Sequence, residues 1–509
     1  MAKPAYLTAP LKTDHMPPGV PFIIGNEAAE RFSFYGMNSI LVVFMTKYLA
    51  DARGNPDLLT AAQAETWYHT FFFWVYLLPI LGAILADAVW GKYRTIFWVS
   101  IIYCFGHLAL AINHTRPGLL IGMALIAIGA GGIKPCVSAN VGDQFGASNQ
   151  HLLTRVFSWF YFSINFGSAF STILIPELLQ RCGPALAFGT PGIFMFIATV
   201  VFWLGRKRFV HIPPVGLRNY AAEFLNLNRL RAVRRSFLVL ILFIVICYYL
   251  GQTFDWKLLR LAAVMTGFVA LIAELFKGQT IFNKETLKII GNLLMPVPFV
   301  AVFWSLWYQN FSSWVVQADK MDRYLFGHEW LPAQIQTANP IFILVMLPLF
   351  SYLVYPAINK AFKLTPLRKI GFGLFTTAVS FLIVAAIQAR IDAGLKPNIV
   401  WQIIAFVFLT ASEVMVSVTH LEFAYTQAPK RMKSIVMCTY LGAVSLGNFF
   451  TAQVNRYIQN PDGTLKLSGA DYFYFFVKVM VVTAILFVIV SPFYQGKTYI
   501  QDEAEAPSP

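Results

Sequence analysis

The first long apolar stretch of the chain contains three charged residues. Glu27, Glu30 and Arg31 stand at positions i, i+3 and i+4 of a helix expected over 22–50, so their side chains share one face. A charged side chain near the middle of a membrane helix costs about 2.5–3.5 kcal/mol, which excludes a lipid-facing position. Glu27 is spaced to pair with Arg31, and Tyr35 extends the same face by one turn. The group is a functional candidate, and the alternative is an internal salt bridge that only helps helices to pack.

Two further polar positions interrupt apolar segments of the first half. His69 stands seven residues before Tyr76, so both lie on one helical face. The alternative for His69 is a satisfied packing residue. Lys134 is a cation in the middle of its segment, beside Pro135, which can kink the helix. Lys134 is a binding candidate or the partner of a buried acid.

Two asparagines and one carboxylate are the later candidates. Asn165 and Asn339 are neutral hydrogen-bonding groups, which could also simply bridge helices. Glu413 lies inside its apolar segment, whereas Glu422 lies near the segment's end, where it can be solvated. Glu413 is therefore the better candidate for a functional carboxylate.

The candidate charges divide between the two halves of the chain. Arg31 and Lys134 belong to the first half, and Glu413 belongs to the second. A cavity between the halves would suit a zwitterion, such as a peptide of two or three residues, about 7–10 Å long when extended. A guanidinium fork suits the carboxylate end of such a peptide. Its side chains would occupy pockets lined by Tyr35, Tyr76 and Trp304.

Composition indicates a membrane protein that crosses the bilayer many times. The chain has 509 residues, of which 57% are hydrophobic and 12% charged, which excludes a single soluble core. The residues before Pro21 contain no apolar run, so we expect no signal peptide and a cytoplasmic N-terminus. The five cysteines show no paired or metal-like spacing and are expected to be small core residues.

The apolar segments follow a pattern of six, two and six, which predicts an all-α membrane protein with fourteen transmembrane helices. With alternating sides, Lys and Arg favour the inside loops by roughly two to one, which explains the net charge of +15 without nucleic acid. The segments lie at 22–50, 66–89, 95–113, 118–141, 154–179, 184–205, 235–254, 259–277, 288–316, 338–361, 370–388, 397–424, 434–456 and 471–495.

Two six-helix halves suggest a transporter whose substrate site lies between them, near the bilayer midplane. Both termini are expected in the cytoplasm. The predicted domains are an N-terminal tail at 1–21, a six-helix bundle at 22–205, a basic linker with two extra helices at 206–287, a second six-helix bundle at 288–497 and a C-terminal tail at 498–509.

At these residues the chain resembles the proton-coupled oligopeptide transporters of the major facilitator superfamily. Residues 27–36, reading Glu-Ala-Ala-Glu-Arg-Phe-Ser-Phe-Tyr-Gly, resemble that family's first-helix motif E-x-x-E-R-F-x-Y-Y-G. Residues 82–96, 160–168 and 421–429 resemble its other signatures. The chain is similar to bacterial members in having two extra helices between the halves, and 389–397 is too short for the large external domain of animal members.

The resemblance implies proton-coupled uptake of di- and tripeptides by a monomer in the inner (plasma) membrane, with no cofactor and no metal. It implies Arg31 and Lys134 near the peptide carboxylate. The other implied roles are peptide amino-end contacts for Glu413, Asn165 and Asn339, wall contacts for Tyr35 and Tyr76, and proton coupling for Glu27, Glu30, Arg31 and His69.

Four residues depart from the family pattern. Phe34 replaces the first Tyr of the motif, and Asn38 replaces a common basic residue. Tyr308 stands where the seventh helix usually has an acid, so Lys134 lacks its usual acidic candidate partner. Tyr440 replaces a common Trp. These changes bear on the gating pairs and on the substrate range.

Three other functions are alternatives to peptide transport. A membrane-embedded enzyme is disfavoured because the chain has no G-x-S-x-G, H-E-x-x-H or metal-ligand cluster. A transporter of nitrate or another anion is disfavoured by Glu413, which adds negative charge to the cavity. A transporter-like sensor without turnover is the third. ATP is not expected to drive transport, because no P-loop is present.

Overall fold

The computed structural model describes residues 6–10, 12–216, 294–420, 433–460, 462 and 464–494. The two inserted helices predicted at 235–254 and 259–277 lie outside these residues, as does Glu422. The chain divides into two compact units. The first comprises residues 1–86, 90–213 and 293–509, so it contains every predicted site residue and both predicted bundles except residues 87–89 and 288–292.

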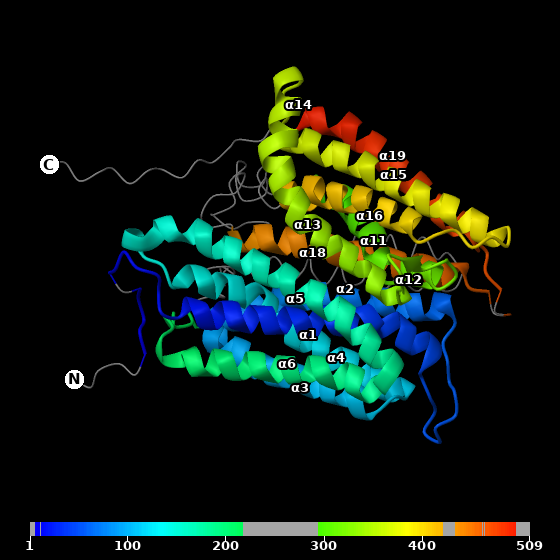
Figure 1. Ribbon diagram of the computed structural model, residues 1–509. Helices are drawn as coiled ribbons and strands as arrows, with labels where there is room; N and C mark the ends of the chain where they lie inside the picture. The colour runs from blue at the N-terminus through cyan, green and yellow to red at the C-terminus, as the bar shows by residue number, and fades with distance from the viewer. Residues whose placement is uncertain are drawn as a thin grey trace, which may run out of the picture. The chain divides into compact units, whose positions relative to one another are not determined.

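Six helices form the first bundle, drawn from blue to green in Figure 1. They are α1 (Val20–Lys47), α2 (Ala61–Leu85), α3 (Lys92–Ile112), α4 (Arg116–Asp143), α5 (Leu153–Cys182) and α6 (Pro184–Leu204), with a π-helical turn at Ala86–Trp90 and short 3-10 turns at Ala147–Leu152 and Gly205–Lys207.

The second bundle contains broken helices. The span expected at 288–316 is divided into α11 (Val297–Trp307), a 3-10 turn (Tyr308–Phe311) and α12 (Ser313–Ala318). A hairpin of β1 (Tyr324–Leu325) and β2 (His328–Glu329) follows, with Tyr324 paired to Glu329. The other elements are a 3-10 turn (Pro332–Thr337), α13 (Ala338–Leu349), a π turn (Phe350–Val354), α14 (Tyr355–Ala361), α15 (Pro366–Asp392), α16 (Val400–Glu413), a π turn (Val414–Val418), α18 (Lys433–Ile458), α19 (Ala470–Val490) and a 3-10 turn (Ser491–Phe493).

The start of α2 is set by its cap rather than by its apolar segment. The Thr60 side chain accepts from the backbone N–H of Gln63, and the Gln63 side chain accepts from the backbone N–H of Thr60. This reciprocal capping box starts the helix at Ala61, five residues before the predicted segment 66–89. The extra turn makes Glu65 part of the helix.

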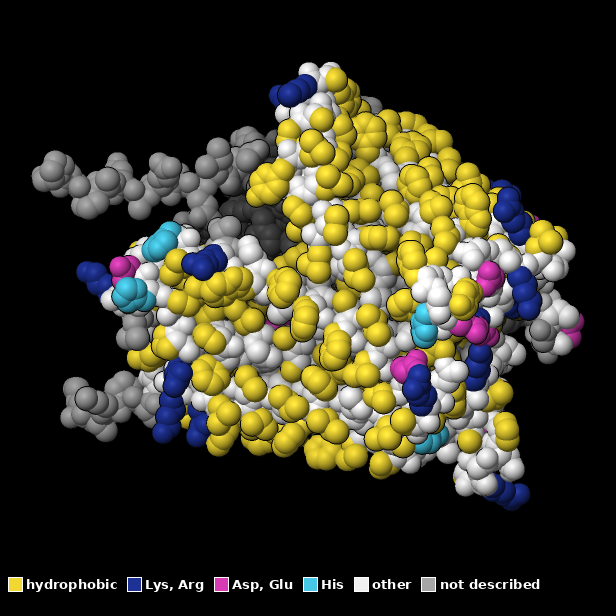
Figure 2. All heavy atoms as spheres, viewed as in Figure 1, with side chains coloured by type: hydrophobic (Ala, Val, Ile, Leu, Met, Phe, Trp, Pro, Cys, Tyr) yellow, Lys and Arg dark blue, Asp and Glu magenta, His cyan; other side chains and the backbone are white. Residues whose placement is uncertain are grey.

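The surface supports a membrane-spanning fold. Figure 2 shows apolar side chains over the middle of the molecule, with most of the visible Lys, Arg, Asp, Glu and His gathered toward two ends. Nine helices within the described residues are long and apolar enough to cross a membrane. α1 is not among them, because its polar residues lower its mean hydropathy. Exposed apolar side chains include Leu81, Trp98, Phe105, Ile112, Phe196, Val345, Val482 and Ile489.

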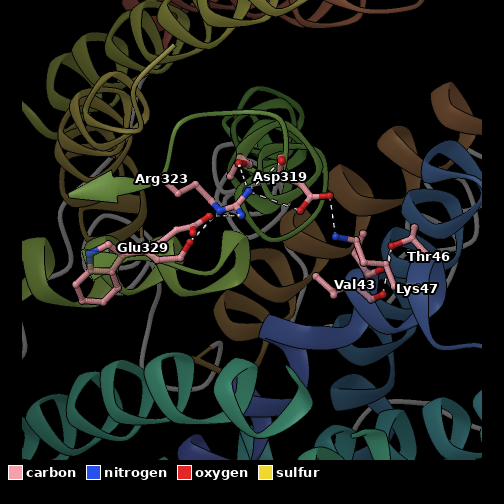
Figure 3. Close-up of polar contacts among 9 residues, drawn as sticks. Val43, Thr46, Lys47, Asp319, Arg323 and Glu329 are labelled. Carbon is pink, nitrogen blue, oxygen red and sulfur yellow. Dashed lines mark hydrogen bonds and ion pairs between the residues drawn. The ribbon is translucent and has the colours of Figure 1, made fainter. Parts of the chain in front are cut away.

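The two bundles are joined toward one end, which we call the α1–α2 end because α1 finishes and α2 begins there. Lys47 Nζ of α1 lies 2.7 Å from Asp319 Oδ2, directly after α12. Figure 3 shows Asp319 between Lys47 and Arg323, and Arg323 lies 3.1 Å from Glu329. Among the described residues, every hydrogen bond between the bundles lies toward this end or near the middle of α2. The other residues of these bonds are Ser39, Glu65, Thr66, His69, Phe73, Tyr76, Thr172 and Ile173 in the first bundle, and Tyr308, Ser312, Gln334, Gln336, Thr337, Ser445, Asn448, Asn455, Gln459 and Tyr472 in the second.

The cysteine prediction holds only in part. Cys136 is buried and Cys104 is half-buried, and both are free thiols. Cys182 is also free but exposed at the last position of α5, so the prediction of a core position is wrong there. The predicted apolar segment ends at residue 179, whereas the helix continues to Cys182.

Close packing of α2 on α4 generates the first prediction. A Cβ at Gly82 would stand 2.8 Å from the Gly132 Cα and would also meet the Gly131 carbonyl oxygen, both backbone atoms. Gly82→Ala should therefore push the helices apart and destabilise the protein by about 1–3 kcal/mol. Thermal unfolding in detergent measures this. Gly189→Ala in α6, where the nearest atom is 4.0 Å away, is the control and should be neutral or stabilising. Equal melting temperatures for the two variants would contradict the packing argument.

Candidate functional site

The charged group of α1 forms a compact cluster. Arg31 Nε lies 2.7 Å from Glu27 Oε1 and 2.9 Å from Glu30 Oε2. All three side chains are largely buried, with 11% of Arg31, 2% of Glu27 and none of Glu30 exposed. The predicted pairing of Glu27 with Arg31 is confirmed, and Glu30 shares the same guanidinium. One cation thus faces two carboxylates in a buried setting.

Lys134 of α4 lies against aromatic rings. Its Nζ is 4.0 Å from the centroid of Phe34 and 5.0 Å from that of Tyr76. Within the described part of the chain, no carboxylate lies within 4.0 Å of this ammonium. The ring faces provide the negative potential that an acid would otherwise supply. Phe34, a departure from the family pattern, is thus a direct neighbour of the cation.

Glu413 accepts two hydrogen bonds at the end of α16. Its Oε2 accepts from Trp307 Nε1 at 2.9 Å and from Asn339 Nδ2 at 2.8 Å. Asn339 Nδ2 also lies 3.1 Å from the Thr410 hydroxyl oxygen. Asn339 and Glu413 therefore come together as predicted, while the contribution of Trp307 was missed, because a Trp in an apolar segment gives no sign of its polar partner.

Aromatic side chains join the cationic and anionic groups. Tyr35, one turn beyond Arg31, stacks on Phe311 with ring centroids 6.4 Å apart, and Phe311 packs 5.7 Å from Trp307. The Tyr308 hydroxyl donates to the Tyr76 hydroxyl at 2.6 Å. Arg31, Lys134 and Glu413 are thus linked across the bundles by one continuous layer of rings.

His69 bridges three segments. Its Nδ1 lies 2.9 Å from Asn448 Oδ1 of α18, and its Nε2 lies 3.1 Å from the hydroxyl of Ser312, just before α12. The ring is fully buried and both nitrogens have partners. The histidine therefore takes part in the contact between the bundles.

The two remaining predicted residues are Asn165 and Trp304. Asn165 Nδ2 donates to the Tyr161 carbonyl of its own helix at 2.9 Å, with no described hydrogen bond to another predicted site residue. Trp304 is buried and packs 5.3 Å from Trp307. A cavity of about 480 Å³ in the second bundle is lined by residues of α13, α14 and α15, the turns between them and the π turn after α16, and by none of the predicted site residues. Within the described residues, no group of His, Cys, Asp or Glu could hold a metal ion.

The Tyr308–Tyr76 bond generates the second prediction. Tyr308→Phe should weaken the contact between the bundles by about 1 kcal/mol, or roughly fivefold in the ratio of closed to open molecules. Spin labels at Leu58→Cys and Tyr324→Cys, exposed positions at the α1–α2 end, would report the distance in a background whose native cysteines are replaced by serine. Tyr440→Phe is the control, because that hydroxyl bonds Ser417 within the second bundle. An unchanged distance distribution in Tyr308→Phe would contradict this role.

A protein-family model and several curated proteins match the sequence of this chain. A model described as the POT family matches residues 93–470. Peptide transporter family 1 of Drosophila melanogaster is 35% identical over 393 residues, covering 74% of this chain and 48% of that protein. The chain spans about half the length of the curated relatives it matches.

Two solved structures cover nearly the whole chain. The first is the structure of an auto-inhibited POT family peptide transporter, which is 35% identical to this chain and has a TM-score of 0.82. The match covers 96% of this chain and 99% of the solved chain. The second is the structure of the POT family transporter PepTSo, which is 36% identical with a TM-score of 0.79, covering 94% and 99%. The predicted all-α major facilitator fold is confirmed. Matched by the family model over most of its length, this chain belongs to the POT family.

Proposed function

We propose that the chain is a proton-coupled symporter that imports di- and tripeptides by alternating access. The observation that carries this proposal is the division of charge: Arg31 and Lys134 in the first bundle, Glu413 in the second, and aromatic rings between them. This arrangement suits a small zwitterion, with its carboxylate toward the cations and its ammonium toward Glu413. Relatives described as peptide transporters support the same cargo.

The proposal includes an orientation in the membrane. With both termini in the cytoplasm of a plasma-membrane protein, the α1–α2 end faces outside. Because the described hydrogen bonds between the bundles gather toward that end, the structure corresponds to an outward-closed state. The peptide would then leave toward the cytoplasm, and one monomer is sufficient for the cycle.

One proton per peptide supplies enough free energy. A proton crossing about 100 mV releases roughly 2.3 kcal/mol, and one pH unit adds about 1.4 kcal/mol. The sum, roughly 3.7 kcal/mol, corresponds to about 500-fold accumulation of a neutral zwitterion.

Coupling is assigned to the acids around Arg31. When Glu27 and Glu30 are ionised, they hold the guanidinium. Protonation of one of them weakens that ion pair and frees Arg31 for the peptide carboxylate. His69 is the second candidate for this step, because an imidazole titrates near neutral pH in water.

Uptake of labelled dialanine into proteoliposomes tests the function. With an inside-negative, inside-alkaline gradient, we expect accumulation that a protonophore abolishes and that other di- and tripeptides, but not free alanine, inhibit. Binding without entry would favour a sensor, and uptake of nitrate without dialanine would favour an anion transporter.

Replacing the two acids gives the third prediction. The double variant Glu27→Gln/Glu30→Gln should lose proton-driven accumulation but retain peptide exchange down a gradient, because nothing then titrates against Arg31. Glu177→Gln is a matched control, since Glu177 and Arg181 form another i,i+4 pair on α5 with a half-buried carboxylate. Undiminished accumulation in the double variant would remove these acids from the coupling step.

Glu413 gives the fourth prediction. Glu413→Gln removes a charge-assisted interaction with the peptide ammonium, worth about 1.5–3 kcal/mol, so the affinity for dialanine should fall roughly 10- to 150-fold. N-acetylated dialanine lacks that ammonium and should compete equally well against both proteins. Competition assays measure this, with Glu329→Gln, on the exposed hairpin, as the control. A similar loss for both ligands would instead indicate a general defect.

A further inference from the structure

Glu65 of α2 is a buried acid outside the proposed site. The residue is only 7% exposed. Its Oε2 lies 3.3 Å from Asn455 Nδ2 of α18 and 3.4 Å from the hydroxyl of Tyr472 on α19. The same hydroxyl lies 2.8 Å from Asn455 Oδ1. The first bundle thus contributes the acid, and the second contributes the amide and the phenol.

The three contacts need three protons, and an ionised Glu65 leaves only two. The amide reaches its two partners through one N–H group and one oxygen, so it donates in one contact and accepts in the other. The phenol has a single proton, which serves only one of its two contacts. Reversing the Asn455 amide changes which contact lacks a proton but not the number. Only a proton on the Glu65 carboxyl completes the ring of hydrogen bonds.

The surroundings supply no cation to stabilise an ionised form. Among the described residues, no Lys, Arg or His nitrogen lies within 4.0 Å of the Glu65 carboxylate. The titratable groups that face it are His69 on its own helix, with both ring nitrogens engaged, Tyr472 on α19, and Lys320 after α12. Lys320 borders the same small cavity but makes no described ion pair with Glu65. An isolated buried carboxylate costs several kcal/mol, which a bound proton removes.

A route for the proton lies beside the cluster. A cavity of about 120 Å³ at the α1–α2 end is lined by Glu65, Gln317, Lys320, Gln388 and Tyr472. Polar groups from both bundles border this cavity. Water entering it would reach the carboxyl directly.

We propose that Glu65 is a proton-binding site that must be loaded before the α1–α2 end closes. Closure brings the acid against Asn455 and Tyr472 and leaves the residue only 7% exposed. Separation of the bundles returns it to water, where it ionises at neutral pH. Closure therefore takes up one proton, so acidic conditions favour the closed end and alkaline conditions oppose it. That this proton comes from outside the cell rests on the proposed function. The uptake of one proton on closure does not rest on it.

Infrared spectroscopy of the purified protein in nanodiscs at neutral pH tests the count. Wild type minus Glu65→Gln should show the carbonyl band of a protonated carboxylic acid, shifted in D₂O. Wild type minus Glu329→Gln, which removes an exposed, ion-paired acid at the same end, should show only carboxylate bands. If Glu65→Gln fails to fold, Tyr472→Phe should still shift the carboxylic band. Absence of that band, or no shift in Tyr472→Phe, would overturn the proposal.

The Leu58/Tyr324 label pair tests the coupling to closure. In the wild type the closed fraction should fall as the pH rises, and Glu329→Gln should follow the wild type. The Glu65→Gln variant lacks the titrating carboxyl. Its closed fraction should therefore fall less than that of the wild type as the pH rises. A pH profile for Glu65→Gln identical to that of the wild type would overturn the proposal. Neither measurement uses a substrate, so a failure of dialanine uptake with both results positive would count only against the proposed peptide transport.

Discussion

An apolar interior does not tolerate an isolated charge, and the buried polar residues of this chain are arranged around that constraint. Four buried ionisable groups described above are compensated in different ways. Arg31 stands between two carboxylates, Lys134 lies on two ring faces, and Glu413 accepts from an indole and an amide. At Glu65 no cation and too few hydrogen-bond donors are available, so a bound proton neutralises the buried carboxylate.

The contacts between the bundles are individually weak enough to break when the bundles move. Near the middle they are neutral hydrogen bonds, such as Tyr308 to Tyr76, which can be exchanged for bonds to water at modest free-energy cost. At the rim the Lys47–Asp319 pair is partly exposed, so it is screened by solvent and contributes little stability. Neither contact locks the bundles together, as a protein that alternates between two conformations requires.

Much of the fold could be predicted from the sequence, because apolar segment length and Lys/Arg distribution follow directly from the bilayer. The cluster around Arg31 was also predictable, since its members share one helical turn. Helix breaks at Tyr308 and at the π turns were not, because they depend on packing between helices. Glu65 was missed because the apolar segment appeared to begin at Thr66, although the Thr60–Gln63 capping box placed the helix start earlier. The partnerships of Trp307 and Asn448 depend on distant segments, which spacing alone does not bring together.

Helix length in the first bundle has a consequence for the surrounding lipid. α3 and α6 have 21 residues each, about 32 Å at 1.5 Å per residue, which matches the hydrocarbon core of roughly 30 Å. α5 has 30 residues, about 45 Å, and must tilt or project beyond the core. Because α3 and α6 are the shortest of the six helices of the first bundle and carry many exposed apolar side chains, they set the hydrophobic thickness on their side of the protein. A thicker or thinner bilayer therefore deforms around α3 and α6, and hydrophobic mismatch acts first on these two helices.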